Sequence, residues 1–168
     1  MSSATATVPY QSEIQTASSQ YGISPSLLAG LIKTESNFNP KATGINTNGT
    51  VDRGITQINS GAHPRVTAAQ AYDPYYAIPY SAQLLSNNIK SCGSVTGGLQ
   101  KYNSGQCSGD TAYSTKVLTA AKGYAGLFPA SGSASTGFMG QITDTIVKYG
   151  LIAIVIVFGI IFVFEGVK

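Results

Sequence analysis

ESNFNPKATGINTNGTVDRGITQINS, residues 35–60, is the stretch of sequence that decides the fold. It begins with a carboxylic acid, Glu35, at the end of an apolar helical pattern. A polar segment with a turn signal follows and carries a second carboxylate, Asp52. A Gly-Ile-Thr-Gln turn then closes the stretch, and the rest of the chain is organised around it.

The helix that leads to Glu35 is clearly marked. Ser24-Pro25 is typical of an N-cap followed by proline at the first helical position, where a missing N–H costs nothing. Apolar residues then recur at helical spacing, at Leu27, Leu28, Leu31 and Ile32. Glu35 continues this apolar face in the last turn, where the helix dipole is negative. We therefore expect burial and the dipole to raise the pKa of the Glu35 carboxyl group.

A hairpin is predicted from Thr43 to Asp52, because Asn48-Gly49 is the strongest short hairpin signal. Folding the two arms back would bring Asp52 near the helix end that holds Glu35. A carboxyl group that stays protonated can donate to the leaving oxygen of a glycosidic bond, with a second carboxylate beside it. The alternative for Asp52 is a structural one, in which it caps N–H groups of the hairpin.

Three motifs in order resemble known families. ESNFNP at 35–40 resembles the catalytic-helix motif of lytic transglycosylases of the soluble (SLT) type, and LQKYNSG at 99–105 is similar to their Tyr-Asn-x-Gly motif. Tyr113 with Val117-Leu118 resembles the closing helix of that family. The run from Glu35 to Ser60 is also close to animal C-type lysozymes, including the hairpin length. The region from about Tyr10 to Tyr124 is therefore identified as a member of the lysozyme-like superfamily.

The resemblance implies roles for particular residues. Glu35 would be the general acid, Ser36 would support it, and Gln57 would line the cleft and bind an acetamido group. Tyr102 would hydrogen-bond near Glu35 and help keep it protonated, with Asn103 on the same wall of the cleft.

The resemblance also implies an activity, a peptidoglycan lytic transglycosylase that cuts the β-1,4 bond between N-acetylmuramic acid and N-acetylglucosamine and leaves a 1,6-anhydro product. Asp52 departs from the transglycosylase pattern and matches the lysozymes, so a hydrolase that uses Asp52 as its second carboxylate is the alternative. A second alternative is a membrane-anchored structural protein of the virion that binds glycan without cleaving it.

The expected fold is α+β and mainly α, a lysozyme-like domain over 8–122 with a small β-hairpin. Besides the helix before Glu35, helices are predicted at 8–21, 66–72 and 95–104. A longer helix is expected to begin at 73–74, and a last helix is expected to end at 121. Pro79 should kink the long helix or delay its start. We expect Gly97-Gly98 to allow close packing against the helix of Glu35.

Cys92 and Cys107 flank a predicted helix that would hold them on the order of 15 Å apart. Two free thiols are therefore expected, and a bridge would require the flanking loops to fold back.

The C-terminal part has a different composition. Residues 123–145 are rich in Gly, Ala and Ser and are predicted to form a linker. Residues 146–167 are apolar and are predicted to form a transmembrane helix that anchors the domain in a lipid membrane.

Charge and composition exclude several partners and cofactors. Through Ala125 the chain carries eight basic and five acidic residues, a mild balance that suits an anionic wall polymer and argues against nucleic acid. One histidine and two distant cysteines do not form a metal-ligand set, and no cofactor is expected.

The N-terminus lacks the pattern of a secretory signal peptide. We therefore expect a single-pass protein in the membrane of a phage particle that opens the wall during entry, with vertex proteins as partners. A bacterial envelope, with a conjugation or secretion apparatus as partner, is the alternative.

Overall fold

The computed structural model describes residues 7–128, 156–157 and 160–161. Its contacts divide the chain into two units, Met1–Ala130 and Ser131–Lys168. The first unit holds six helices and a three-stranded sheet among its described residues, so the expected α+β, mainly helical class is confirmed there. The helices are α1 (Gln11–Tyr21), α2 (Pro25–Ser36), α3 (Ala68–Tyr72), α4 (Pro74–Cys92), α5 (Val95–Ser104) and α6 (Ala112–Lys122).

Helix α2 is the centre of the core. Its apolar residues from Leu27 to Ile32 are almost completely buried, as the helical spacing predicted. Gly30 lies against α6, and a Cβ atom at this position would come within 2.7 Å of the Val117 carbonyl oxygen. Only glycine therefore allows these two helices to approach so closely, and this contact places the start of α6 beside the end of α2.

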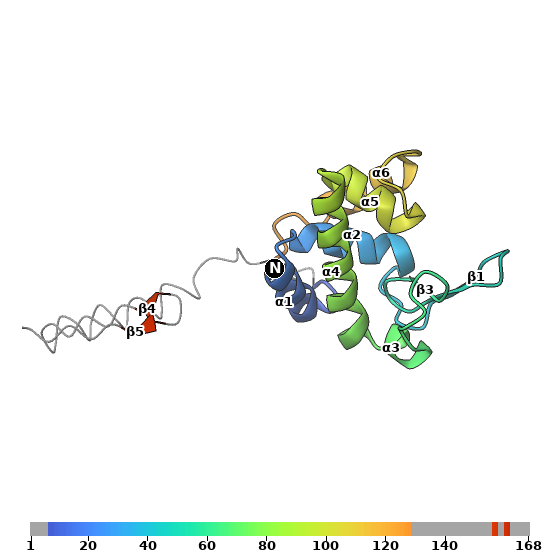
Figure 1. Ribbon diagram of the computed structural model, residues 1–168, viewed down its shortest axis with the longest axis horizontal. Helices are drawn as coiled ribbons and strands as arrows, with labels where there is room; N and C mark the ends of the chain where they lie inside the picture. The colour runs from blue at the N-terminus through green and yellow to red at the C-terminus, as the bar shows by residue number, and fades with distance from the viewer. Residues whose placement is uncertain (1–6, 129–155, 158–159, 162–168) are drawn as a thin grey trace, which may run out of the picture. The chain divides into compact units, whose positions relative to one another are not determined.

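The sheet is antiparallel, in the order β1 (Thr43–Ile45), β2 (Val51–Arg53) and β3 (Ile58–Asn59). The predicted turn at Asn48-Gly49 joins β1 to β2, and Gly49 has a positive φ of 81°. Figure 1 shows the sheet and α3 at one end of the helical body, with the hairpin projecting beyond the helices. Since Gly44 pairs with Asp52, which pairs in turn with Asn59, these three residues form one row across the sheet.

Helices α4 and α5 pack closely, and this corrects one expectation. Gly98 lies against Ile89 of α4, where an added Cβ would come within 2.8 Å of the backbone. The glycine pair therefore serves the contact with α4 and not the contact with α2. Pro79 lies inside α4, which begins at Pro74, so the proline does not delay the start of that helix.

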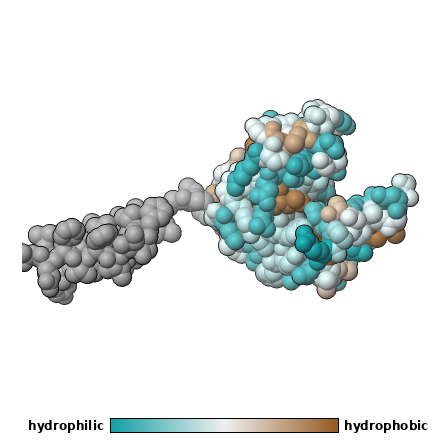
Figure 2. All heavy atoms as spheres, in the orientation of Figure 1, coloured by the Kyte–Doolittle hydropathy of each residue, from teal (hydrophilic) through white to brown (hydrophobic). Residues whose placement is uncertain are grey.

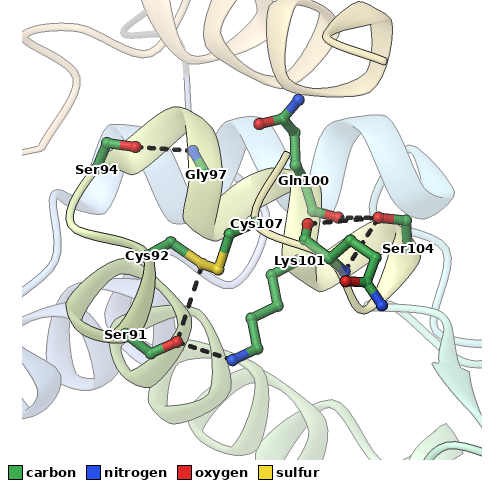
Figure 3. Close-up of a disulfide and its surroundings, with 9 residues drawn as sticks. Ser91, Cys92, Ser94, Gly97, Gln100, Lys101, Ser104 and Cys107 are labelled. Carbon is green, nitrogen blue, oxygen red and sulfur yellow. Dashed lines mark hydrogen bonds between the residues drawn. A yellow bond between two sulfur atoms is a disulfide. The ribbon is translucent and has the colours of Figure 1, made fainter. Parts of the chain in front are cut away.

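The two cysteines are joined, which corrects the expectation of free thiols. Cys92 and Cys107 form a disulfide with their Cα atoms 5.4 Å apart. The expected separation of the two cysteines was based on the length of the helix between them. The segment after α5 folds back along that helix and brings Cys107 to Cys92 (Figure 3). The Gln100 side chain holds the same segment by donating to the Gly109 carbonyl oxygen at 2.9 Å.

The prediction of a transmembrane helix over 146–167 is wrong. None of the helices in the described residues is both long and apolar enough to cross a membrane. Within that range the structure describes β4 (Ile156–Val157) and β5 (Ile160–Ile161), which pair antiparallel. The remaining residues of the range, and residues 129–145 of the predicted linker, lie outside the described residues. The boundaries of the domain and the linker stay predictions. Of the residues assigned to the linker, Tyr124, Leu127 and Phe128 pack against the core of the first unit.

Candidate active site

Glu35 lies in the last turn of α2, one residue before the helix ends. The chain leaves the helix through two residues in the left-handed region, Asn37 with φ 55° and Phe38 with φ 64°. This turn sends the chain away from the helix axis toward the sheet. Phe38 packs edge-on against Tyr124, with the ring centroids 5.8 Å apart, which fixes the turn against the C-terminal end of the domain.

The carboxyl group of Glu35 has a pKa raised from its ordinary value of 4.5 to about 7. Burial is the largest cause, because it disfavours the charged form. The hydrogen bond from Tyr113 and the charge of Lys116 act in the opposite direction, and the negative charge of Asp52 raises the pKa further. Near neutral pH the side chain is therefore divided between acid and carboxylate, as a group that donates and then accepts a proton must be.

Tyr113 is the direct partner of Glu35. Its phenol, on the first turn of α6, donates a hydrogen bond to Oε1 of Glu35. Burial and the nearby Glu35 carboxylate raise the pKa of Tyr113 well above its usual range, so the phenol remains a hydrogen-bond donor. The sequence motif included Tyr113 in the closing helix but gave no sign that it contacts the acid, because the two residues are 78 positions apart.

Asp52 lies on β2 and is held by two amides. Asn46 donates to Oδ2 at 2.9 Å and Asn59 donates to Oδ1 at 2.7 Å. Each carboxylate oxygen thus accepts from a donor on a neighbouring segment of the sheet. This arrangement fixes a negative charge whose field reaches Glu35.

The turn Gly54-Ile55-Thr56-Gln57 connects the sheet to the acid. The hydroxyl of Ser36 donates to the Ile55 carbonyl oxygen at 2.7 Å, which fastens the turn to the residue after Glu35. Gly54 has a positive φ of 75°, and a Cβ there would lie 1.9 Å from the Ala71 carbonyl oxygen, so no other residue fits. Ser36 therefore supports the site through the backbone of the turn.

Gln57 belongs to the same turn and has a positive φ of 51°. Its side-chain amide donates to the carbonyl oxygens of Gly54, at 2.8 Å, and Ala42, at 3.2 Å. The side chain is thus oriented by backbone on both sides of the hairpin. Binding of a substrate acetamido group by Gln57 stays a prediction.

Tyr102 forms its hydrogen bonds with the turn and with α4, and its expected role in keeping Glu35 protonated stays a prediction. Its hydroxyl is within hydrogen-bond distance of the Thr56 carbonyl oxygen, at 3.0 Å, and of Ser81 Oγ, at 3.1 Å. Ser81 in turn donates to Thr56 Oγ1 at 2.8 Å, so a buried polar network joins α4, α5 and the turn. Burial, followed by the charge of Glu35, raises the pKa of Tyr102 above its usual range, which places the two side chains in the same region. Asn103 follows on α5 with an exposed side chain.

Sequence reasoning missed several members of this constellation, namely Asn46, Asn59, Thr56, Ser81 and Lys116. A polar residue at any of these positions is ordinary in itself, and only the fold shows what it contacts. Figure 2 shows the surface hollowed between the helices and the projecting sheet, with apolar side chains at the floor of the hollow. In the described part of the chain no group of three His, Cys, Asp or Glu side chains could hold a metal ion.

Comparison with known proteins gives consistent matches. A family model described as the transglycosylase SLT domain matches residues 12–121. A protein named Transglycosylase from Enterobacteria phage PRD1 is 35% identical over 92 residues, which cover 55% of this chain and 33% of that protein. Protein IpgF of Shigella flexneri is 32% identical over 96 residues, which cover 53% of this chain and 62% of that protein. The chain thus spans about a third of the phage relative and less than two thirds of the Shigella relative.

Proposed function

Because this chain belongs to the transglycosylase SLT domain family, we propose that it is a peptidoglycan lytic transglycosylase with Glu35 as its catalytic acid. The observation that carries this proposal is the Glu35 carboxyl group, whose pKa is raised by burial to about 7 at the end of an apolar helix. The substrate is the β-1,4 bond between N-acetylmuramic acid and N-acetylglucosamine.

In the first step protonated Glu35 donates its proton to the glycosidic oxygen, and the bond from that oxygen to C1 of the muramic acid breaks. Positive charge develops at C1 and its ring oxygen. Asp52, held in place by Asn46 and Asn59, stabilises this charge through space.

In the second step the Glu35 carboxylate removes the proton from the C6 hydroxyl of the same sugar. The C6 oxygen then attacks C1, which closes a 1,6-anhydro ring without water and regenerates the acid. A pKa near 7 suits a residue that serves as acid and then as base. Tyr113 keeps one carboxylate oxygen in place during both steps.

Hydrolysis is the second candidate, and Asp52 is the observation that favours it. A fixed carboxylate whose charge acts on the acid could capture or shield the cation while water completes the reaction, as in glycosidases with two carboxylates. Mass spectrometry of digested peptidoglycan separates the two candidates. Muropeptides with a 1,6-anhydro end are one water lighter than hydrolysis products, and a majority of intact reducing ends would overturn the transglycosylase proposal.

A Glu35→Gln variant separates either enzyme from a glycan-binding structural protein. The amide can still accept a hydrogen bond from Tyr113 but has no acidic proton to transfer to the glycosidic oxygen. We expect release of soluble muropeptides to fall at least about 100-fold while the circular dichroism spectrum is kept. Unchanged release would show that Glu35 is not the acid.

We place this activity in local opening of the cell wall during phage entry. The similarity to a phage protein named Transglycosylase supports that setting, and a bacterial envelope machine remains the alternative. Antibody detection in purified particles tests the proposal, and absence of the protein from particles that are infective would contradict it.

A further inference from the structure

A second groove is lined by residues other than those of the active site. It runs between α1 and the start of α4 and consists of two adjoining open hollows, of about 600 and 290 Å³. Both hollows share Ser12, Glu13 and Tyr75 as lining residues. Neither Glu35 nor Asp52 lines either hollow, so the groove is separate from the catalytic constellation.

Tyr75 gives the groove an aromatic surface. It is 68% exposed at the second position of α4, where the Asp73 carboxylate accepts a hydrogen bond from its backbone N–H at 2.9 Å. The capped helix start is thus fixed, while the ring remains open to solvent. An exposed aromatic ring on a fixed helix start is a suitable platform for the apolar face of a sugar.

Tyr10 lines the first hollow together with Tyr75. Its φ is 56°, in the left-handed region, and it forms the N-cap of α1 without a side-chain capping bond. Residues with a Cβ atom rarely adopt this conformation. Glycine or asparagine would suit the backbone better, but the Tyr10 ring is partly buried and packs against the core, so it forms a fixed wall of the first hollow.

The remaining lining mixes polar side chains with the apolar Ala17 and Pro79 of the second hollow. Ser12 donates to the Glu13 carboxylate at 2.8 Å, and Gln11 is held by a hydrogen bond to the Leu127 carbonyl oxygen at 2.9 Å. Thr16 and Gln20 continue the lining of the second hollow. Amide, hydroxyl and carboxylate groups beside a tyrosine ring match the hydroxyl and acetamido groups of a sugar chain. Among the residues that the structure describes, no cationic side chain lines the groove, which argues against a polyanion such as a nucleic acid.

We propose that this groove is a second binding site for a chain of N-acetylated sugars, which holds a glycan strand while the active site cuts elsewhere in the wall. The choice of ligand rests on the proposed function. A site of this kind matters on an insoluble polymer, because it raises the local concentration of bonds at the active site.

The test uses the full chain with Glu35→Gln, so that the probe is not consumed, and follows backbone amides by NMR. The probe is the β-1,4-linked hexamer of N-acetylglucosamine. We expect shifts at Glu13 and Tyr75 in addition to those in the active site. Tyr75→Ala should weaken the shifts at Glu13 at least about tenfold in apparent affinity, and Tyr75→Phe should retain them because stacking needs only the ring.

Two further variants keep the result interpretable if Tyr75→Ala disturbs the helix start. Thr16→Arg fills the second hollow from an exposed position on α1, and Thr96→Arg is a matched change on α5 outside the groove. With Glu35 left intact, Thr16→Arg should reduce activity on insoluble sacculi several-fold relative to activity on soluble glycan, and Thr96→Arg should not change that ratio.

Shifts confined to the active site, or an unchanged ratio for Thr16→Arg, would overturn the proposal. Shifts in the groove alone would support it while counting against glycan binding at the active site, so the two proposals can fail separately.

Discussion

The phenol of Tyr113 donates a hydrogen bond to Oε1 of Glu35, joining the first turn of α6 to the last turn of α2. The close approach of these helices at Gly30 makes the contact possible. The acid is thus held by a neutral donor that does not remove its proton. Burial dominates the pKa of Glu35, while Tyr113 moderates it.

Tyr113→Phe should raise the pKa of Glu35 further, because the lost hydrogen bond favours the carboxylate. The alkaline limb of the activity profile should therefore move to higher pH. The maximal rate should fall about tenfold, since the acid loses its orientation. Steady-state rates on soluble glycan across pH measure both effects, and a downward shift of the limb would contradict this role.

Activity of the unmodified protein should fall as pH rises through about 7, because only protonated Glu35 can donate. Above that pH the rate should drop about tenfold for each unit. The residual rate of Glu35→Gln serves as the control and should lack this limb. A rate that stays flat into strongly alkaline solution would exclude a single general acid at this position.

The free energy of unfolding should also depend on pH through the protonation of Glu35. The folded pKa of Glu35 is raised, so between about 4.5 and about 7 the folded state binds more protons than the unfolded state. The free energy of unfolding therefore falls as pH rises through this window. The lowered pKa of His63, caused by burial, contributes the opposite slope, so the comparison must be made with Glu35→Gln. Urea denaturation at several pH values should show that the free energy of unfolding declines more steeply with pH in the unmodified protein than in Glu35→Gln. Parallel dependences on pH would contradict the raised pKa.

Asp52→Asn should lower the pKa of Glu35, because a nearby negative charge is removed. The alkaline limb should move to lower pH, and Lys116→Met should move it to higher pH as a control of opposite sign. For a transglycosylase we expect the maximal rate of Asp52→Asn to fall by no more than about tenfold, with anhydro products retained. A loss of more than about 100-fold, together with hydrolysis products from the unmodified protein, would make Asp52 the second carboxylate of a hydrolase.

Replacing both Cys92 and Cys107 by serine should destabilise the domain by about 3 kcal/mol, since the disulfide closes a short loop around α5. The melting temperature should fall on the order of 10 °C. A thiol reductant should lower the melting temperature of the unmodified protein and leave the double variant unchanged. Equal melting temperatures for both proteins in oxidising buffer would show that the bridge adds no stability.

Local patterns in the sequence determined the helices, the hairpin and the acid. The spacing from Leu27 to Ile32, the proline at the start of α2 and the Asn48-Gly49 turn each act over a few residues, so no knowledge of the fold is needed to interpret them. The position of Glu35 at the end of an apolar face was enough to predict a raised pKa, and the structure confirms its direction.

Only the tertiary structure decided which side chains meet. Tyr113 hydrogen-bonds to Glu35, a contact that no local pattern predicted, because α6 crosses α2 at Gly30. The bridge between Cys92 and Cys107 depends on the path of the chain after α5, which helix length alone cannot give. Contacts across dozens of residues depend on how whole helices pack, and packing follows from the shapes of two surfaces together, which no single stretch of sequence contains.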